Sequence, residues 1–211
     1  YLTELNDWKN GRIIAQDFSS AQPVIRAGIK AGDKVLDLCA APGGKSLQAS
    51  EKAAAVVACD LTEKKAALIK ENAERYRADN IEIRVRDARI HCDEFDGAFD
   101  VVLADLPCSG IGTISGKPDV KNRITIEDCR SLASLQSEIL DNACSYVKPG
   151  GKLVYSTCTV DHYENEDVVR AFLQKNQDFM LVEEKQILPD TEPADIPKDG
   201  FYYAVMSKKE L

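Results

Sequence analysis

The sequence predicts an α/β protein built on a mostly parallel, seven-stranded sheet with helices on both faces. Three observations lead to this fold class. Short apolar segments alternate along the chain with segments of helical periodicity. The segment FDVVLAD at Phe99–Asp105 is apolar almost throughout, which is typical of a strand buried on both faces. A glycine-rich turn, DLCAAPGGKS at Asp37–Ser46, joins the first strand to the next helix.

Each element follows from a local pattern. Thr62 is expected to cap a helix that runs to Tyr76, because threonine accepts hydrogen bonds from the first N–H groups of a helix. A long helix over Ile126–Val147 is expected to stop at KPGG. The expected strands are Lys34–Leu38, Ala55–Asp60, Ile81–Asp87, Phe99–Asp105 and Lys152–Thr157, then the pair MLVEE and GFYYAVM, with the helix ENEDVVRAFLQKN before that pair.

The length of 211 residues, 44% of them hydrophobic, suits a single domain with a core. We expect that domain to cover residues 33–211. Residues 1–32 are expected to form a lead-in segment with a short helix and, in QDFSSAQPVIRAGI, a serine-capped helix. Because the first residue is Tyr1 rather than methionine, we expect the chain to be a fragment of a longer protein.

Composition narrows the class of protein. The seven cysteines are irregularly spaced without a CxxC pair, and there are two histidines, so neither a metal site nor a disulfide framework is expected. This cysteine usage, with no apparent membrane span or signal peptide, predicts a cytoplasmic protein. A net charge of −8 argues against binding nucleic acid by bulk electrostatics. Acidic residues gather between Asp178 and Gly200, however, so a local basic patch elsewhere stays possible.

A cofactor site is predicted at the carboxyl ends of the strands, where ligands bind in parallel sheets. Small residues in the glycine-rich turn let a ligand approach the main chain, and the helix after the turn directs N–H groups at it. Asp60 ends the second strand and is placed to accept both hydroxyls of a ribose, and Asp87 ends the third and could meet an adenine amino group. The candidate cofactor residues in the turn are Cys39, Ala40, Ala41, Pro42, Gly43, Gly44 and Lys45.

A ligand with a ribose and an adenine but no required phosphate fits S-adenosyl-L-methionine. NAD is the competing ligand, and the absence of GxGxxG counts against it. A tight strand–helix turn without any ligand is the alternative. Lys45 either supports the turn or reaches the methionine carboxylate or the substrate.

Three segments carry a resemblance to a known family. DLCAAPGGKS, ADLPCSGIGT and YSTCT, in this order and spacing, resemble the RsmB/Sun-type RNA (cytosine-5) methyltransferases, relatives of the Nop2/NSUN enzymes. QDFSSAQP, KPDVK and DGFYYAVM are lesser matches, and the resemblance covers essentially the whole chain. It implies a class I, Rossmann-like methyltransferase fold and S-adenosylmethionine as cofactor. Bacterial relatives often carry an upstream NusB-like RNA-binding domain, and we expect that domain to be missing from this fragment.

The implied reaction is methyl transfer to carbon 5 of a cytidine in RNA, with 16S-type ribosomal RNA the expected substrate. A thiolate that adds to carbon 6 makes carbon 5 nucleophilic, and a nearby acid assists by protonating N3. The resemblance assigns the attack to Cys158, assistance in breaking down the adduct to Cys108, and binding of N3 and the exocyclic amine to Asp105, which also lies at the cofactor site. As the acid, Asp105 should have a pKa raised by burial.

The residues alone leave the order of the two cysteines open, because DNA cytosine-5 methyltransferases use the cysteine of a Pro-Cys motif. Two core cysteines, or a disulfide, are alternatives, but the hydroxyl and glycine neighbours favour a polar site. The strands that precede Cys108 and Cys158 are expected to be neighbours, so that both residues reach one pocket.

RNA contacts are predicted in and just after the loop that follows Cys108. Lys117, Lys121 and Arg123, with Arg130 just beyond, either bind phosphates or form a solvated loop, and the two interpretations stand about equal. The expected partner is RNA, with no membrane and no metal, and the protein is expected to be a monomer. The rival functions are methylation of tRNA or of a non-RNA substrate, and an inactive RNA-binding scaffold.

Overall fold

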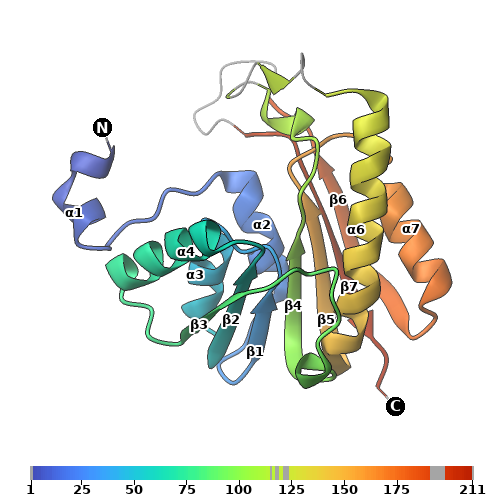
Figure 1. Ribbon diagram of the computed structural model, residues 1–211, viewed down its shortest axis with the longest axis horizontal. Coiled ribbons are helices and arrows are strands. Elements are labelled where there is room, and N and C mark those ends of the chain that lie inside the picture. Colours follow the sequence, from blue (N-terminus) through green and yellow to red (C-terminus); the bar gives the residue numbers. More distant parts are fainter. Residues whose placement is uncertain (1, 115, 117–118, 121–123, 191–197, 211) are drawn as a thin grey trace.

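The computed structural model describes residues 2–210 except 115, 117–118, 121–123 and 191–197 (Figure 1). Seven strands form one sheet in the order β3-β2-β1-β4-β5-β7-β6. The neighbouring strands from β3 to β5 pair in parallel, and β7 runs antiparallel to both of its neighbours. The strands are β1 (Lys34–Asp37), β2 (Ala55–Asp60), β3 (Ile81–Val85), β4 (Phe99–Asp105), β5 (Val147–Thr157), β6 (Phe179–Ile187) and β7 (Phe201–Lys208).

Helices cover both faces of the sheet, as predicted. On one face lie α2 (Phe18–Ala27), α3 (Gly44–Ser50) and α4 (Glu63–Tyr76), and on the other lie α6 (Ile126–Tyr146) and α7 (Glu166–Lys175) (Figure 1). The chain begins with a short 3₁₀ turn (Leu2–Glu4) and α1 (Asn6–Lys9), and two more 3₁₀ turns lie at Asp93–Phe95 and Ile111–Thr113. No helix in the described ranges combines the length and apolar character needed to cross a bilayer.

The central strand β4 shows how the sequence pattern produces the two-faced core. Val101 and Leu103 pack under α2, whereas Val102 and Ala104 pack under α6, and all four are buried. Side chains alternate between the faces of a strand, so a strand covered on both faces must be apolar at every position. The apolar run therefore predicted this strand correctly.

Several element ends differ from the predictions, most of them by one or two residues. Strand β5 begins at Val147 rather than Lys152, because Val147 pairs with Phe99 before the register shifts at an irregularity. Strand β3 ends at Val85 rather than Asp87. Helix α2 is capped by Asp17 and not by a serine, since the Asp17 carboxylate accepts the N–H groups of Ser19 and Ser20.

The strand order places the candidate site. The chain runs outward from β1 through β2 to β3 and then returns to β4 on the other side of β1, so the strand order reverses between β1 and β4. Ligands in open α/β sheets bind in the crevice that opens at such a switch point, outside the carboxyl ends of the strands. The glycine-rich turn after β1 and the Pro-Cys segment after β4 therefore face the same crevice.

Candidate active site

Two cysteine sulfurs meet at the carboxyl edge of the sheet. The ends of β4 and β5 pair side by side, with Asp105 opposite Ser156, which brings the following turns together. The Sγ atoms of Cys108 and Cys158 are 3.1 Å apart, and the Cys158 N–H donates to Cys108 Sγ at 3.2 Å. All seven cysteines lie in the described ranges, and none forms a disulfide.

The two thiols differ in their surroundings. The hydrogen bond with Cys158 and, after it, burial raise the pKa of the Cys108 thiol well above its ordinary value. Cys108 therefore keeps its proton at neutral pH and can donate it to the neighbouring sulfur as a hydrogen bond. A protonated thiol at this distance is in a position to donate a hydrogen bond to a thiolate on Cys158.

Both turns are fixed by direct links between them. Ser109 Oγ and Thr159 Oγ1 are 2.8 Å apart, and the Gly112 N–H donates to the carbonyl oxygen of Cys158 at 3.1 Å. Gly112 has no room for a side chain, because an added Cβ would lie 2.0 Å from the Gly200 carbonyl oxygen. The glycine therefore permits a close approach of three segments that are distant in sequence.

Asp105 ends β4 and faces an ammonium group. Its Oδ2 lies 2.8 Å from Lys45 Nζ, and its Oδ1 accepts a hydrogen bond from Ser156 Oγ at 2.6 Å. The side chain is partly buried, with 29% of it exposed. A cation and a hydroxyl orient the carboxyl group toward the crevice, and its role as an acid stays a prediction.

Lys45 follows the glycine-rich turn and contacts Asp105 at the end of β4. It lies in the first turn of α3, and its Nζ also donates to Ser20 Oγ at 2.7 Å and lies 5.2 Å from the centre of the Phe201 ring. The side chain is buried, so its three partners fix its position. None of these three partners belongs to the glycine-rich turn, so the roles predicted for Lys45 stay predictions. Ser20 comes from the segment that the sequence marked only as a lead-in.

Asp60 braces the glycine-rich turn. Its carboxylate accepts the Ala41 N–H at 3.0 Å and the Leu61 N–H at 2.7 Å, and Lys65 Nζ lies 3.1 Å from Oδ1. Gly43 caps α3 at a φ of 110°, in the left-handed region that favours glycine. The prediction that the ends of β1 and β2 form one site is consistent with this contact.

Two cavities open along this edge and share Cys39. One, of about 250 Å³, lies between the glycine-rich turn, Lys45 and Asp105. The other, of about 300 Å³, is more apolar and is lined by Asp60, Asp87, Leu135 and Ile139, among others. The first cavity is lined by charged groups. The second cavity has mostly apolar walls that include two carboxylates. An extended ligand with a charged end and an aromatic end matches this pair of cavities.

The two carboxylates of the apolar cavity differ in accessibility. Asp60 is buried, whereas Asp87 is partly exposed and bound by Arg89, whose Nε lies 3.0 Å from Oδ1. The hydrogen bonds from Arg89 lower the pKa of Asp87. Asp87 therefore presents an ionised acceptor at the cavity rim, at the place predicted for an adenine contact.

Asp37 is a site residue that the sequence analysis did not single out. It ends β1 beside the charged cavity and is buried, and burial is the main reason that its pKa is raised to about 7. Oδ2 accepts from Ser46 Oγ at 2.6 Å, while Oδ1 has no hydrogen-bond partner among the described residues. A buried acceptor without a partner beside a ligand cavity is a place where a cation or donor of the ligand fits. The signal available in the sequence was the aspartate at the end of the first strand.

The structure does not describe most of the residues predicted to contact RNA. Lys117, Lys121 and Arg123 lie outside the described residues. Arg130 is exposed on α6, with its guanidinium 5.6 Å from the centre of the Tyr163 ring. Their contact with RNA therefore stays a prediction.

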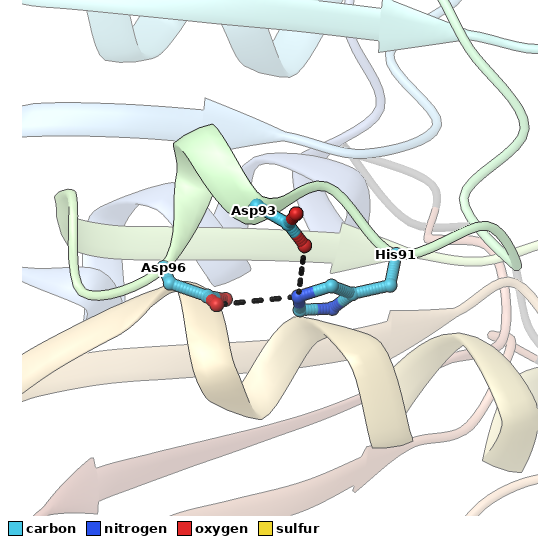
Figure 2. A group of neighbouring side chains, drawn as sticks. All are labelled: His91, Asp93 and Asp96. Carbon is cyan, nitrogen blue, oxygen red and sulfur yellow. Dashed lines mark hydrogen bonds and ion pairs between the residues drawn. The ribbon is translucent and has the colours of Figure 1, made fainter.

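The absence of a metal also stays a prediction. Figure 2 shows His91 between Asp93 and Asp96, with Nε2 at 3.4 Å from Asp93 Oδ1 and 3.2 Å from Asp96 Oδ2. All three residues are exposed and precede β4, away from the carboxyl edge where the cysteines lie. The two aspartates contact the His91 imidazole at the surface of the protein, and this group is separate from the crevice.

Comparison with known proteins identifies the family. Residues 27–207 match the family described as "16S rRNA methyltransferase RsmB/F". The chain is 37% identical over 211 residues to "Ribosomal RNA small subunit methyltransferase B" of Vibrio cholerae and 39% identical over 219 residues to "Probable ribosomal RNA small subunit methyltransferase B" of Bacillus subtilis. These alignments cover 98% and 96% of this chain, but 48% and 49% of the relatives, so the chain spans about half their length.

Solved structures agree with the fold. NSun6 from Pyrococcus horikoshii, crystallised with SFG, has a TM-score of 0.87 at 25% identity, and the match covers all of this chain and 57% of that one. A methyltransferase homologue from the same organism has a TM-score of 0.81 at 28% identity, covering 99% and 72%. The family match and the sheet order agree: the chain belongs to the RsmB/F family of 16S rRNA methyltransferases and has the class I methyltransferase fold.

Proposed function

We propose that this chain transfers a methyl group from S-adenosyl-L-methionine to carbon 5 of a cytidine in 16S-type ribosomal RNA, through a covalent bond between Cys158 and the base. The observation that carries the proposal is the 3.1 Å contact between the Cys108 and Cys158 sulfurs, within the same crevice as Asp105. A ribosomal substrate is supported by the names of the relatives in Vibrio cholerae and Bacillus subtilis.

The cofactor residues fit S-adenosylmethionine. When bound, this cofactor supplies the methyl group from its sulfonium. Asp37 Oδ1, buried and without a partner among the described residues, suits the α-ammonium group of the methionine part. The apolar cavity suits the adenine, with Asp60 near the ribose and Asp87 near the exocyclic amine.

The chain's own residues then divide the work. Cys158 gives its thiol proton to water and forms a bond from Sγ to carbon 6 of cytosine. Asp105, which lies beside Lys45 in the free protein, takes up a proton from water as the base binds and passes it to N3, so the ring becomes an enamine that is nucleophilic at carbon 5. After methylation, water takes the carbon-5 proton, the double bond between carbons 5 and 6 re-forms, and the carbon–sulfur bond breaks. The electron pair returns to Cys158 Sγ, where the Cys108 thiol stabilises it by a hydrogen bond, and N3 returns its proton to Asp105.

The experiment that tests the proposal compares two alanine variants on a 16S rRNA transcript. Cys158→Ala should abolish methylation and form no adduct, while S-adenosylmethionine still binds by calorimetry. Cys108→Ala should accumulate a protein–RNA adduct that survives denaturing electrophoresis. An adduct in Cys158→Ala but not in Cys108→Ala would exchange the two roles. Full methylation in Cys158→Ala would remove the covalent mechanism, and bisulfite sequencing identifies the methylated cytidine.

A further inference from the structure

We infer that Glu164 is a positioning residue that, with Gln136, holds the main chain on both sides of Cys108 and thereby aims the Cys108 thiol at Cys158. This inference rests on the proposed function, because it concerns the step that Cys108 assists. Glu164 follows the Thr-Cys turn in sequence, and Gln136 lies in the middle of α6. The mechanism above uses neither residue.

The contacts surround the Pro-Cys turn on two sides. Glu164 Oε2 accepts the Ser109 N–H at 2.9 Å, and Gln136 Nε2 donates to the Pro107 carbonyl oxygen at 2.9 Å. Gln136 Nε2 also donates to Glu164 Oε2 at 3.0 Å, which joins the two contacts into one unit. Cys108 lies between the two residues that are held, so its main chain, and with it the direction of the Cα–Cβ bond, is fixed by these hydrogen bonds.

Burial makes these contacts costly to break. Glu164 and Gln136 are both fully buried, and Tyr155, also buried, donates to Gln136 Oε1 at 3.0 Å and contacts the Glu164 carbonyl oxygen. A hydrogen bond to a buried carboxylate is stronger than one between neutral groups, and an N–H left without an acceptor there is strongly unfavourable. A carboxyl group kept in the core only for packing would be a poor choice, because an apolar residue of similar volume avoids the desolvation cost.

The placement of Glu164 also connects the two cysteine turns. The Ser109 that it holds by its N–H is the residue whose hydroxyl contacts Thr159, next to Cys158. The carboxylate therefore controls the distance between the sulfurs from the Cys108 side. A shift of the Pro-Cys turn by less than an ångström would weaken the hydrogen bond that stabilises the departing Cys158 thiolate, without removing either cysteine.

The expected result is a variant that attacks the base normally but releases it slowly. Glu164→Ala leaves the Ser109 N–H without its acceptor, so the adduct should break down about tenfold or more slowly and accumulate on denaturing gels. Glu164→Gln keeps an oxygen at the same place and should restore breakdown to within a few-fold of the parent rate. Asn80→Ala is the matched control, since it removes two hydrogen bonds to the Ser50 and Ala53 carbonyl oxygens at the opposite edge of the sheet.

The outcomes separate this inference from the proposed function. The full chain is incubated with a 16S rRNA transcript and S-adenosylmethionine, and adduct and methylated product are both followed in time. If Cys108→Ala accumulates adduct but Glu164→Ala only loses methylation in proportion to its folded fraction, as Asn80→Ala would, Glu164 is structural and the inference is wrong. If Cys108→Ala accumulates no adduct, the role proposed for Cys108 fails, and this inference fails with it.

A second variant decides the matter if Glu164→Ala does not fold. Gln136→Met has a similar shape and removes the donor to the Pro107 carbonyl oxygen, while Glu164 keeps its bond to Ser109. It should also accumulate adduct, to a smaller extent than Cys108→Ala. Adduct breakdown at the parent rate in a folded Gln136→Met protein would overturn the inference.

Discussion

Asp37→Asn should make the folded chain more stable at pH 8 and weaken its affinity for S-adenosylmethionine. Burial raises the pKa of Asp37 to about 7 in the folded state, against 3.8 for the ordinary group. Below about pH 4 the folded and unfolded chains both carry this proton. Between pH 4 and pH 7 the unfolded chain has lost it and the folded chain keeps it, so stability falls as the pH rises.

The magnitude follows from the two pKa values. At 1.36 kcal/mol for each pH unit, the ionisation of Asp37 destabilises the fold by about 4 kcal/mol above pH 7. Asparagine removes this term but places an NH₂ group where Oδ1 had no partner, at a cost of about 1–3 kcal/mol that does not depend on pH. The difference in stability between Asp37→Asn and the parent should therefore shift by about 3 kcal/mol in favour of the variant from pH 5 to pH 8.

The assay is urea unfolding of both proteins at several pH values, followed by circular dichroism. Asp100→Asn is the control of opposite sign. Burial opposes the ionisation of Asp100, but the Lys34 N–H and Lys148 lower its pKa, so that variant should lose stability at neutral pH and little in acid. A stability difference between Asp37→Asn and the parent that is the same at pH 5 and pH 8 would refute the reasoning.

Ligand binding gives an independent test of the same residue. If Asp37 accepts the ammonium group of the cofactor, its loss should weaken S-adenosylmethionine binding about tenfold at pH 8. Below pH 7 the affinity of the parent should fall, because the carboxyl group must first release its proton, whereas the affinity of Asp37→Asn should change little. Calorimetry at pH 6 and pH 8 measures both effects.

Three further variants test the site and the core. Asp60→Ala should weaken S-adenosylmethionine binding by about tenfold in calorimetry, because it removes both a ribose acceptor and the brace on the glycine-rich turn; an unchanged affinity would remove Asp60 from the site. Gly112→Ala places a Cβ 2.0 Å from a main-chain oxygen and should lower the free energy of unfolding by about 3 kcal/mol, with a matching fall in melting temperature. Gly32→Ala is the control, because its Cβ meets nothing within 4 Å, and it should keep the melting temperature of the parent. Leu140→Ala should lower the free energy of unfolding in urea by about 2–5 kcal/mol, because Leu140 is fully buried. Leu68 is exposed, so Leu68→Ala should leave that free energy nearly unchanged, and equal losses in the two variants would contradict the assigned core.

The alternation of strands and helices was readable from the sequence because each pattern is local. FDVVLAD predicts β4 at its observed bounds, and Thr62 predicts the start of α4, since both depend on residues a few positions apart. The early start of β5 was not predicted because Val147 pairs with Phe99, which is distant in sequence. The sequence predicts a serine cap for α2 because Asp17, Ser19 and Ser20 all favour the N-cap position of a helix, and only the fold shows that Asp17 occupies it.

The sequence by itself determined the α/β class, the glycine-rich turn and the two cysteine motifs, because these depend on residue types and short spacings. Only the tertiary structure decided what stands next to them. It placed Lys45 against Asp105, left one oxygen of Asp37 without a partner, and buried Glu164 behind Cys108. These are contacts between residues from different elements, and the charge that each group feels depends on burial and on neighbours that no local pattern specifies.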